Sequence, residues 1–184
     1  MQARLVLPGV VALLLAATPL PAQGPDGSAN RAGLDRLAFM VGRWTGEAWM
    51  QRGAERVHTT MTETVVPKLG GTVLQVDGLG VVPGPDTAAP RVVHNALGIV
   101  SFDPATGTYT MRSYIGTGQS GDFTLTLVEG GVSWSREVPG GRIRNTAHIG
   151  KGVWHEVGEF SRDGATWVRI MEMNLRQEAA GAAP

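Results

Sequence analysis

Tight-turn signals recur along the chain after Trp44, and short stretches rich in β-branched and aromatic residues separate them. Short strands joined by tight turns are typical of an antiparallel meander, in which each strand folds back on its neighbour. A long meander has to hide its two edges, and closure into a barrel is the usual solution. The turn signals lie at residues 103–107, 129–131, 139–141, 150–152 and 162–164.

The strand-forming stretches predict an all-β fold. No segment after Met40 sustains a helical period over more than two turns, which argues against an α/β fold. A sandwich would need long crossovers, and only residues 82–90 form a loop of that length. We therefore predict an antiparallel up-and-down β-barrel of ten strands, with a short N-terminal helix capping one end. The strands are expected at residues 43–51, 55–66, 72–82, 92–102, 108–115, 121–128, 132–138, 142–149, 153–161 and 166–176.

The chain begins with the pattern of a secretory signal peptide. Arg4 precedes an apolar run from Leu5 to Leu15, and the small residue Ala22 follows. The run is shorter than a membrane-spanning helix requires, so we expect cleavage near Ala22 and a periplasmic or secreted protein without a membrane span. The predicted organisation is a signal peptide over 1–22, a flexible leader over 23–32, the barrel domain over 33–176 with its helix at 33–40, and a disordered tail over 177–184.

Composition limits the classes of partner and chemistry. The 184 residues contain 16 basic and 16 acidic side chains and no basic block, which makes nucleic acid an unsuitable partner. There is no cysteine, so thiol catalysis, thiolate metal sites and disulfides are all excluded. The length suits one domain with a substantial core, as a monomer or homodimer.

The opening of the domain resembles a known superfamily. A Leu-x-x-Leu helix, with Leu34 and Leu37, is followed by Val-Gly-x-Trp-x-Gly-Glu over residues 41–47. This opening is similar to that of nitrobindin-like and related calycin barrels, which are kin to the lipocalins. Residues 97–103 and 161–167 resemble an exported bacterial family of that superfamily whose function is unknown. The resemblance implies that Trp44 packs across the closed end of the barrel, beneath the short helix.

The resemblance also brings haem into consideration. Nitrobindins bind haem through a histidine, and this chain has His58, His94, His148 and His155. His94 precedes a Gly-containing segment, as a histidine does in nitrobindins, and His155 lies on the predicted ninth strand. Haem is thus a candidate cofactor, with His155 or His94 as its axial ligand.

Strand alternation identifies candidate cavity residues. In the last strand Arg169 shares a face with Trp167, and we interpret that face as interior. An inward arginine would suit an anionic ligand because its guanidinium offers a bidentate fork, although a surface ion pair is the commoner role. Glu63, which lies among threonines, is expected to face water. The candidate ligand-binding residues are Trp49, Met61, Met111, Trp134, Trp167, Arg169, Met171 and Met173.

No catalytic motif is present in the sequence. It contains no nucleophile elbow, no zinc-protease helix and no phosphate-binding glycine loop. We therefore expect an exported barrel that binds an apolar or amphipathic small molecule, with methionines adapting its wall to the ligand. Three alternatives stay open: a haem protein, an enzyme that uses the cavity, which is the weaker class, and a barrel filled solid with a structural role.

Overall fold

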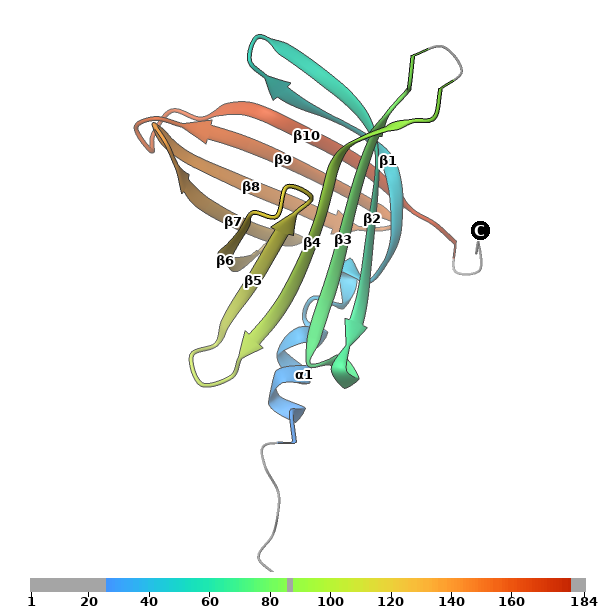
Figure 1. Ribbon diagram of the computed structural model, residues 1–184. Helices are drawn as coiled ribbons and strands as arrows, with labels where there is room; N and C mark the ends of the chain where they lie inside the picture. The colour runs from blue at the N-terminus through green and yellow to red at the C-terminus, as the bar shows by residue number, and fades with distance from the viewer. Residues whose placement is uncertain (1–25, 86–87, 180–184) are drawn as a thin grey trace, which may run out of the picture.

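The computed structural model describes residues 26–85 and 88–179 and shows a closed antiparallel barrel of ten strands (Figure 1). Each strand pairs with its successor in the chain, and β10 returns to pair with β1. The predicted all-β up-and-down barrel is thereby confirmed. The strands are β1 (Gly42–Arg52), β2 (Glu55–Lys68), β3 (Val73–Val82), β4 (Arg91–Asp103), β5 (Thr108–Ile115), β6 (Ser120–Val128), β7 (Gly131–Val138), β8 (Gly141–Gly150), β9 (Val153–Ser161) and β10 (Val168–Gln177).

The tight turns behave as the sequence predicts. Asp103 accepts hydrogen bonds from the Ala105 amide and the Thr106 hydroxyl, both at 2.9 Å. Asp163 stabilises the β9–β10 turn in the same way, accepting from the amides of Ala165 and Thr166. Aspartate side chains that bind nearby amides favour a turn over a continued strand, which fixes the point where the chain reverses.

A short helical segment closes one end of the barrel. It consists of α1 (Ser28–Asp35) and the single 3-10 turn η1 (Ala38–Met40). A helix of eight residues is too short to be stable alone, so tertiary contacts must hold it. The Tyr109 hydroxyl donates to the Gly33 carbonyl at 2.7 Å, and the Asn30 amide donates to the Phe102 carbonyl at 2.8 Å. Gly33 is required here because any side chain would collide with the Phe102 ring.

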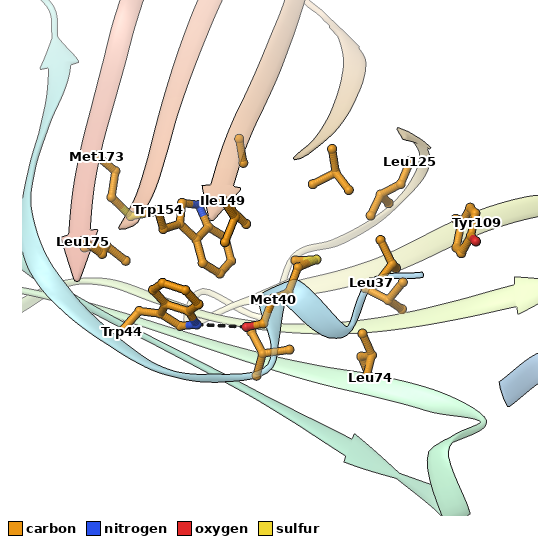
Figure 2. Packing of buried hydrophobic residues seen from close by; sticks show 14 of the residues in the cluster. Leu37, Met40, Trp44, Leu74, Tyr109, Leu125, Ile149, Trp154, Met173 and Leu175 are labelled. Atoms are coloured by element: carbon orange, nitrogen blue, oxygen red, sulfur yellow. Dashed lines mark hydrogen bonds between the residues drawn. The ribbon is translucent and has the colours of Figure 1, made fainter. Parts of the chain in front are cut away.

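Trp44 joins this closing segment to the barrel (Figure 2). Its indole nitrogen donates to the Met40 carbonyl at 2.9 Å, and its ring meets Trp154 edge-on with centroids 5.7 Å apart. Trp44 is 1% exposed, and Leu37 and Leu175 are equally buried in the same cluster. The closed end is thus a packed apolar floor, with Trp44 in the position that the sequence resemblance implies.

The helix lies earlier than the sequence analysis expects. α1 begins at Ser28, inside the stretch interpreted as a flexible leader, and only its last residues overlap the expected 33–40 segment. The polar composition of residues 28–32 obscures the start of the helix, because the buried residues of α1, Gly33 and Leu34, come only at its end. Contacts with β3, β4 and Tyr109 hold the rest. The predicted signal peptide over 1–22 and the end of the tail, residues 180–184, lie outside the described residues.

We predict that Trp44→Ala lowers the free energy of unfolding by about 3–5 kcal/mol, because a large buried side chain is replaced by a cavity and its hydrogen bond is lost. Denaturant unfolding followed by circular dichroism measures the change.

Trp49→Ala on the outer face of the same strand is the matched control. Its ring is covered by the Arg56 guanidinium at 4.0 Å, so its loss should cost only about 1 kcal/mol. Equal destabilisation by the two substitutions would contradict the role assigned to Trp44.

Candidate functional site

The barrel holds a cavity of about 360 Å³ above the floor formed by Met40 and Trp154. Its wall takes the inward-facing residues of most strands, because alternate side chains of a β-strand point to opposite faces. A volume in this range is typical of small-molecule sites. The interior is therefore not filled solid by side chains.

Methionine dominates the wall. Six of the seven methionines in the sequence line the cavity, and the seventh is Met1, which lies outside the described residues. Flexible, polarisable thioether side chains adapt to irregular ligand shapes. Phe123, Leu125 and Trp134 add rigid apolar surface. The lining methionines are Met40, Met50, Met61, Met111, Met171 and Met173.

Glu63 brings a carboxyl group into this apolar wall. It is 8% exposed and faces inward from β2, between Met61 and Val65. Its carboxyl lies against the Cα of Gly78 on β3, where an added β-carbon would come within 2.8 Å of Oε1. Among the described residues, no hydrogen bond or ion pair reaches this carboxyl. The expectation that Glu63 faces water is wrong, because the register of β2 places it on the same inward face as Met61.

Glu156 supplies a second buried carboxyl to the cavity wall. It is 6% exposed on β9, and its only hydrogen bond in the described part of the chain comes from the Trp154 indole at 3.3 Å. Burial raises the pKa of Glu156 to about 7, and the Trp154 bond only partly opposes this. Burial also raises the pKa of Glu63 well above its usual value, and the nearby carboxyls of Glu156 and Asp77 add to that shift. The cavity thus favours the protonated form of both acids relative to their state in water.

Three further ionisable side chains line the cavity. His94 faces inward from β4, and burial lowers its pKa, so its imidazole is neutral at pH 7. Arg52 and Arg136 border the cavity at the far ends of their strands from the floor, and both are exposed. Arg52 donates to the Val93 carbonyl at 3.1 Å. The site therefore has positive charge at its outer rim and carboxyl groups deep inside.

Six of the eight residues predicted from the sequence border the cavity. The side chains of Met61, Met111, Trp134, Met171 and Met173 belong to the inward face of their strands. Trp49 also borders the cavity, but alternation from Trp44 places its ring on the outer face.

Arg169 and Trp167 lie away from the cavity wall. A register shift between Arg169 and Met171 breaks the simple alternation of β10, so that Met171 faces inward while Arg169 pairs with Glu159 on the outside. Arg169 forms an ion pair with Glu172 at 3.0 Å, and the Trp167 ring is covered by the Arg144 guanidinium. The sequence pattern does not reveal this bulge. Because of it, Arg169 and Met171, which were predicted to share one face, lie on opposite faces of the sheet.

The two histidines considered as haem ligands also lie on opposite faces of the barrel wall. His94 lines the cavity, whereas His155 belongs to the outer face of β9, where its Nε2 lies 2.9 Å from Glu172 Oε1. The hydrogen bond with His155 is the main reason that the pKa of Glu172 lies below its usual value. Within the described residues, no group of three or more histidine and acidic side chains is arranged to hold a metal ion.

The sequence analysis missed Glu63 and Glu156 as site residues. Alternation could have found both, since Glu63 shares a face with Met61 and Val65, and Glu156 shares one with Trp154. The neighbouring threonines of β2 obscured the signal, because threonine is common on either face of a strand.

The hydrogen-bonded ladder is shortest between β6 and β7. These strands pair only from Leu125 opposite Trp134 to Val128 opposite Gly131. The rest of β6, which begins at Ser120, and of β7, which runs to Val138, are not paired with each other. Beyond the Leu125–Trp134 pair, the wall between β6 and β7 therefore lacks the cross-strand bonds that join the other neighbouring strands.

Fold and cavity together define a closed ten-stranded antiparallel barrel with a plugged floor and an interior site. No family model matches the sequence, and a search of curated proteins finds no match either. Among solved structures, the chain is similar to the crystal structure of Rv2717c from M. tuberculosis, with a TM-score of 0.58 and 10% identity over 80% of this chain and 98% of that one. At this identity, the similarity shows a shared fold alone. No helix within residues 26–85 and 88–179 is long and apolar enough to cross a membrane.

We predict that the stability of the ligand-free protein falls between pH 5 and pH 8, because of Glu156. Its pKa is about 7 in the folded protein and 4.5 as a model value, so over that interval the unfolded chain binds fewer protons than the folded one. Stability must then fall as pH rises, by at most about 3 kcal/mol. Glu156→Gln should make this decline smaller by up to that amount, as measured by denaturant unfolding at each pH, and the raised pKa of Glu63 should maintain a decline of the same sign.

Glu47→Gln on the exposed outer face of β1 is the control, and it should keep the wild-type pH profile. A Glu156→Gln variant with the same decline as wild type would show that this carboxyl is not buried as described.

Proposed function

We propose that this protein is an exported, calycin-like binding protein that holds an apolar or amphipathic small molecule inside its barrel. The single observation that carries the proposal is the cavity of about 360 Å³ walled by six methionines. Export rests on the signal-peptide pattern of residues 1–22. The meander topology and the short helical segment that packs against Trp44 at the closed end support the calycin-like assignment.

The chemistry of the wall favours a ligand with a substantial apolar body. The wall presents the thioethers of Met61, Met111 and Met173 and the rings of Phe123 and Trp134. The hydrophobic effect therefore favours burial of an alkyl or aromatic group in the cavity. The few polar groups then fix the orientation of the ligand, as is usual in such sites. We propose binding rather than catalysis as the function class, because the sequence carries none of the catalytic motifs considered above.

The unpaired stretches of β6 and β7 offer a route for the ligand. Opening the wall there breaks few backbone hydrogen bonds, because Phe123 and Arg136 lie beyond the end of the β6–β7 ladder. Segments with few such bonds open at low free-energy cost. We propose that ligands pass between these strands.

A cavity-filling substitution tests this function. Ala96 on β4 lines the cavity, so Ala96→Phe should occupy the ligand's space and weaken the binding of a neutral apolar fluorescent probe such as N-phenyl-1-naphthylamine by about tenfold or more. Fluorescence titration of the purified protein measures the affinity.

Leu97→Phe provides the matched control, because Leu97 is the next residue of the same strand and lies exposed on the outer face. Binding that both variants leave at the wild-type level would place the probe outside the barrel and contradict the proposal.

Haem is the second candidate ligand, and the position of His94 favours it. A neutral imidazole in an apolar cavity is suited to coordinate iron, and Arg52 and Arg136 at the rim could face the acidic groups of a haem. His94 would hold the iron in this arrangement, whereas His155 forms a hydrogen bond with Glu172 on the outer surface.

Titration with haemin distinguishes the two histidines. If His94 is the ligand, His94→Ala abolishes the Soret shift that the wild-type protein gives, and His155→Ala leaves it unchanged. A wild-type protein that gives no Soret shift would remove the haem candidate, and a shift lost only in His155→Ala would reverse the assignment.

A further inference from the structure

Two carboxyl groups inside one apolar cavity are costly. Moving a carboxylate out of water is unfavourable by several kcal/mol unless a cation or several hydrogen-bond donors replace the lost hydration. Glu63 receives no hydrogen bond from the described residues, and Glu156 receives one long bond from Trp154. Their mutual repulsion adds to the cost rather than offsetting it.

The cationic side chains of the cavity do not offset this cost. Arg52 and Arg136 border its exposed rim, and no ion pair joins either of them to Glu63 or Glu156 among the described residues. His94 is held neutral by burial. What the site lacks is a positive charge at the depth of the two carboxyls, and a ligand is able to supply it.

We propose that the cavity binds an organic cation, an amine with an apolar body, whose ammonium group lies between the carboxyls of Glu63 and Glu156. This inference rests on the proposed binding function and specifies the chemical class of its ligand. The N–H groups of an ammonium match the open acceptor positions of Glu63, because charge-assisted hydrogen bonds are the strongest of their kind.

The surroundings of the two acids suit the same class of ligand. Trp154 donates a hydrogen bond to the Glu156 carboxyl, and Trp134 and Phe123 line the cavity, so the site has the aromatic rings that commonly accompany bound cations. The methionine wall accepts an alkyl chain. A fatty acid would fit less well, because its carboxylate would meet like charges inside the barrel and find its counter-charges only at the rim.

Binding of a cation must be linked to protons. The groups that face the site are Glu63 and Glu156 themselves, His94 on β4, Arg52 on β1 and Arg136 on β7, with Asp77 acting on Glu63 from β3. An alkylamine stays protonated from pH 6 to pH 8. The carboxyls lose protons as pH rises through that interval, and a cation requires them ionised, so its affinity should rise with pH.

The experiment compares three eight-carbon probes by isothermal titration calorimetry: octylamine, octan-1-ol and octanoate. At pH 8 we expect octylamine to bind about tenfold or more tightly than octan-1-ol, and octanoate to bind weakest. With the Glu156 pKa near 7, octylamine affinity should be about tenfold lower at pH 6 than at pH 8, while octan-1-ol affinity stays nearly constant.

Substitutions localise the effect. Glu63→Gln and Glu156→Gln should each reduce octylamine affinity by about tenfold without weakening octan-1-ol, and Glu47→Gln should change neither. Thermal melts check that each variant folds. If one of the two fails to fold, the other variant and the wild-type pH dependence decide the question.

The outcomes separate the two proposals. Octylamine and octan-1-ol binding equally, or octanoate binding tightest, would overturn the cation inference and leave the binding function standing. Octylamine affinity that falls as pH rises would also overturn it, since that sign indicates a ligand that requires protonated carboxyls. Failure of all three probes to bind would count against the cavity function and the inference together.

Discussion

Pairing of β1 with β10 is the constraint on which the rest of the structure depends. It closes the sheet along a register that runs from Trp44 opposite Gln177 to Met50 opposite Met171. The two strands approach closely at Gly46, where any side chain would collide with the Asn174 carbonyl. Closure removes the sheet edges and turns one face of every strand into an interior. Trp44, on β1 as well, bonds to Met40 of the closing helical segment. The strand that closes the barrel therefore also holds the floor of the cavity in place.

The interior created in this way combines two opposing chemistries. Methionines and aromatic rings provide a wall of low polarity, and Glu63 and Glu156 introduce groups that such a wall disfavours in their charged form. The strand register forces the combination, because both acids occupy inward positions between buried neighbours. Glu63 receives no hydrogen bond from the described residues, and Glu156 receives a single one, from Trp154. Perturbed acids inside a cavity are typical of functional sites. We propose that ligand recognition accounts for both.

The sequence predicts the fold better than it predicts the site. Turn residues such as Asp103 and Asp163, together with period-2 strands, depend on local chemistry, and they led to the correct ten-strand barrel. Five of the apolar residues that the sequence analysis named as wall candidates do face the cavity: Met61, Met111, Trp134, Met171 and Met173.

The predictions that failed concern positions whose structure depends on residues far away in the sequence. The bulge of β10 separates Arg169 from Met171, and only pairing with β9 reveals it. The helix at Ser28 is specified by Tyr109 and Phe102, which lie far along the chain. Glu63 was hidden because a carboxyl among threonines is usual on a solvated strand, and only closure of the barrel makes that face an interior.

The most direct test of the central claim, an accessible ligand chamber walled by methionines, is NMR of the protein labelled with ¹³C at its methionine methyl groups. Six of the seven methionines line the cavity, so their signals report on its floor and on the wall at β1, β2, β5 and β10. Titration with an apolar eight-carbon ligand should shift the methyl resonances of Met61, Met111 and Met173 together and saturably, with contacts from ligand protons to these methyls. Methyl resonances that stay unchanged throughout the titration would show that nothing enters the barrel and would contradict the account.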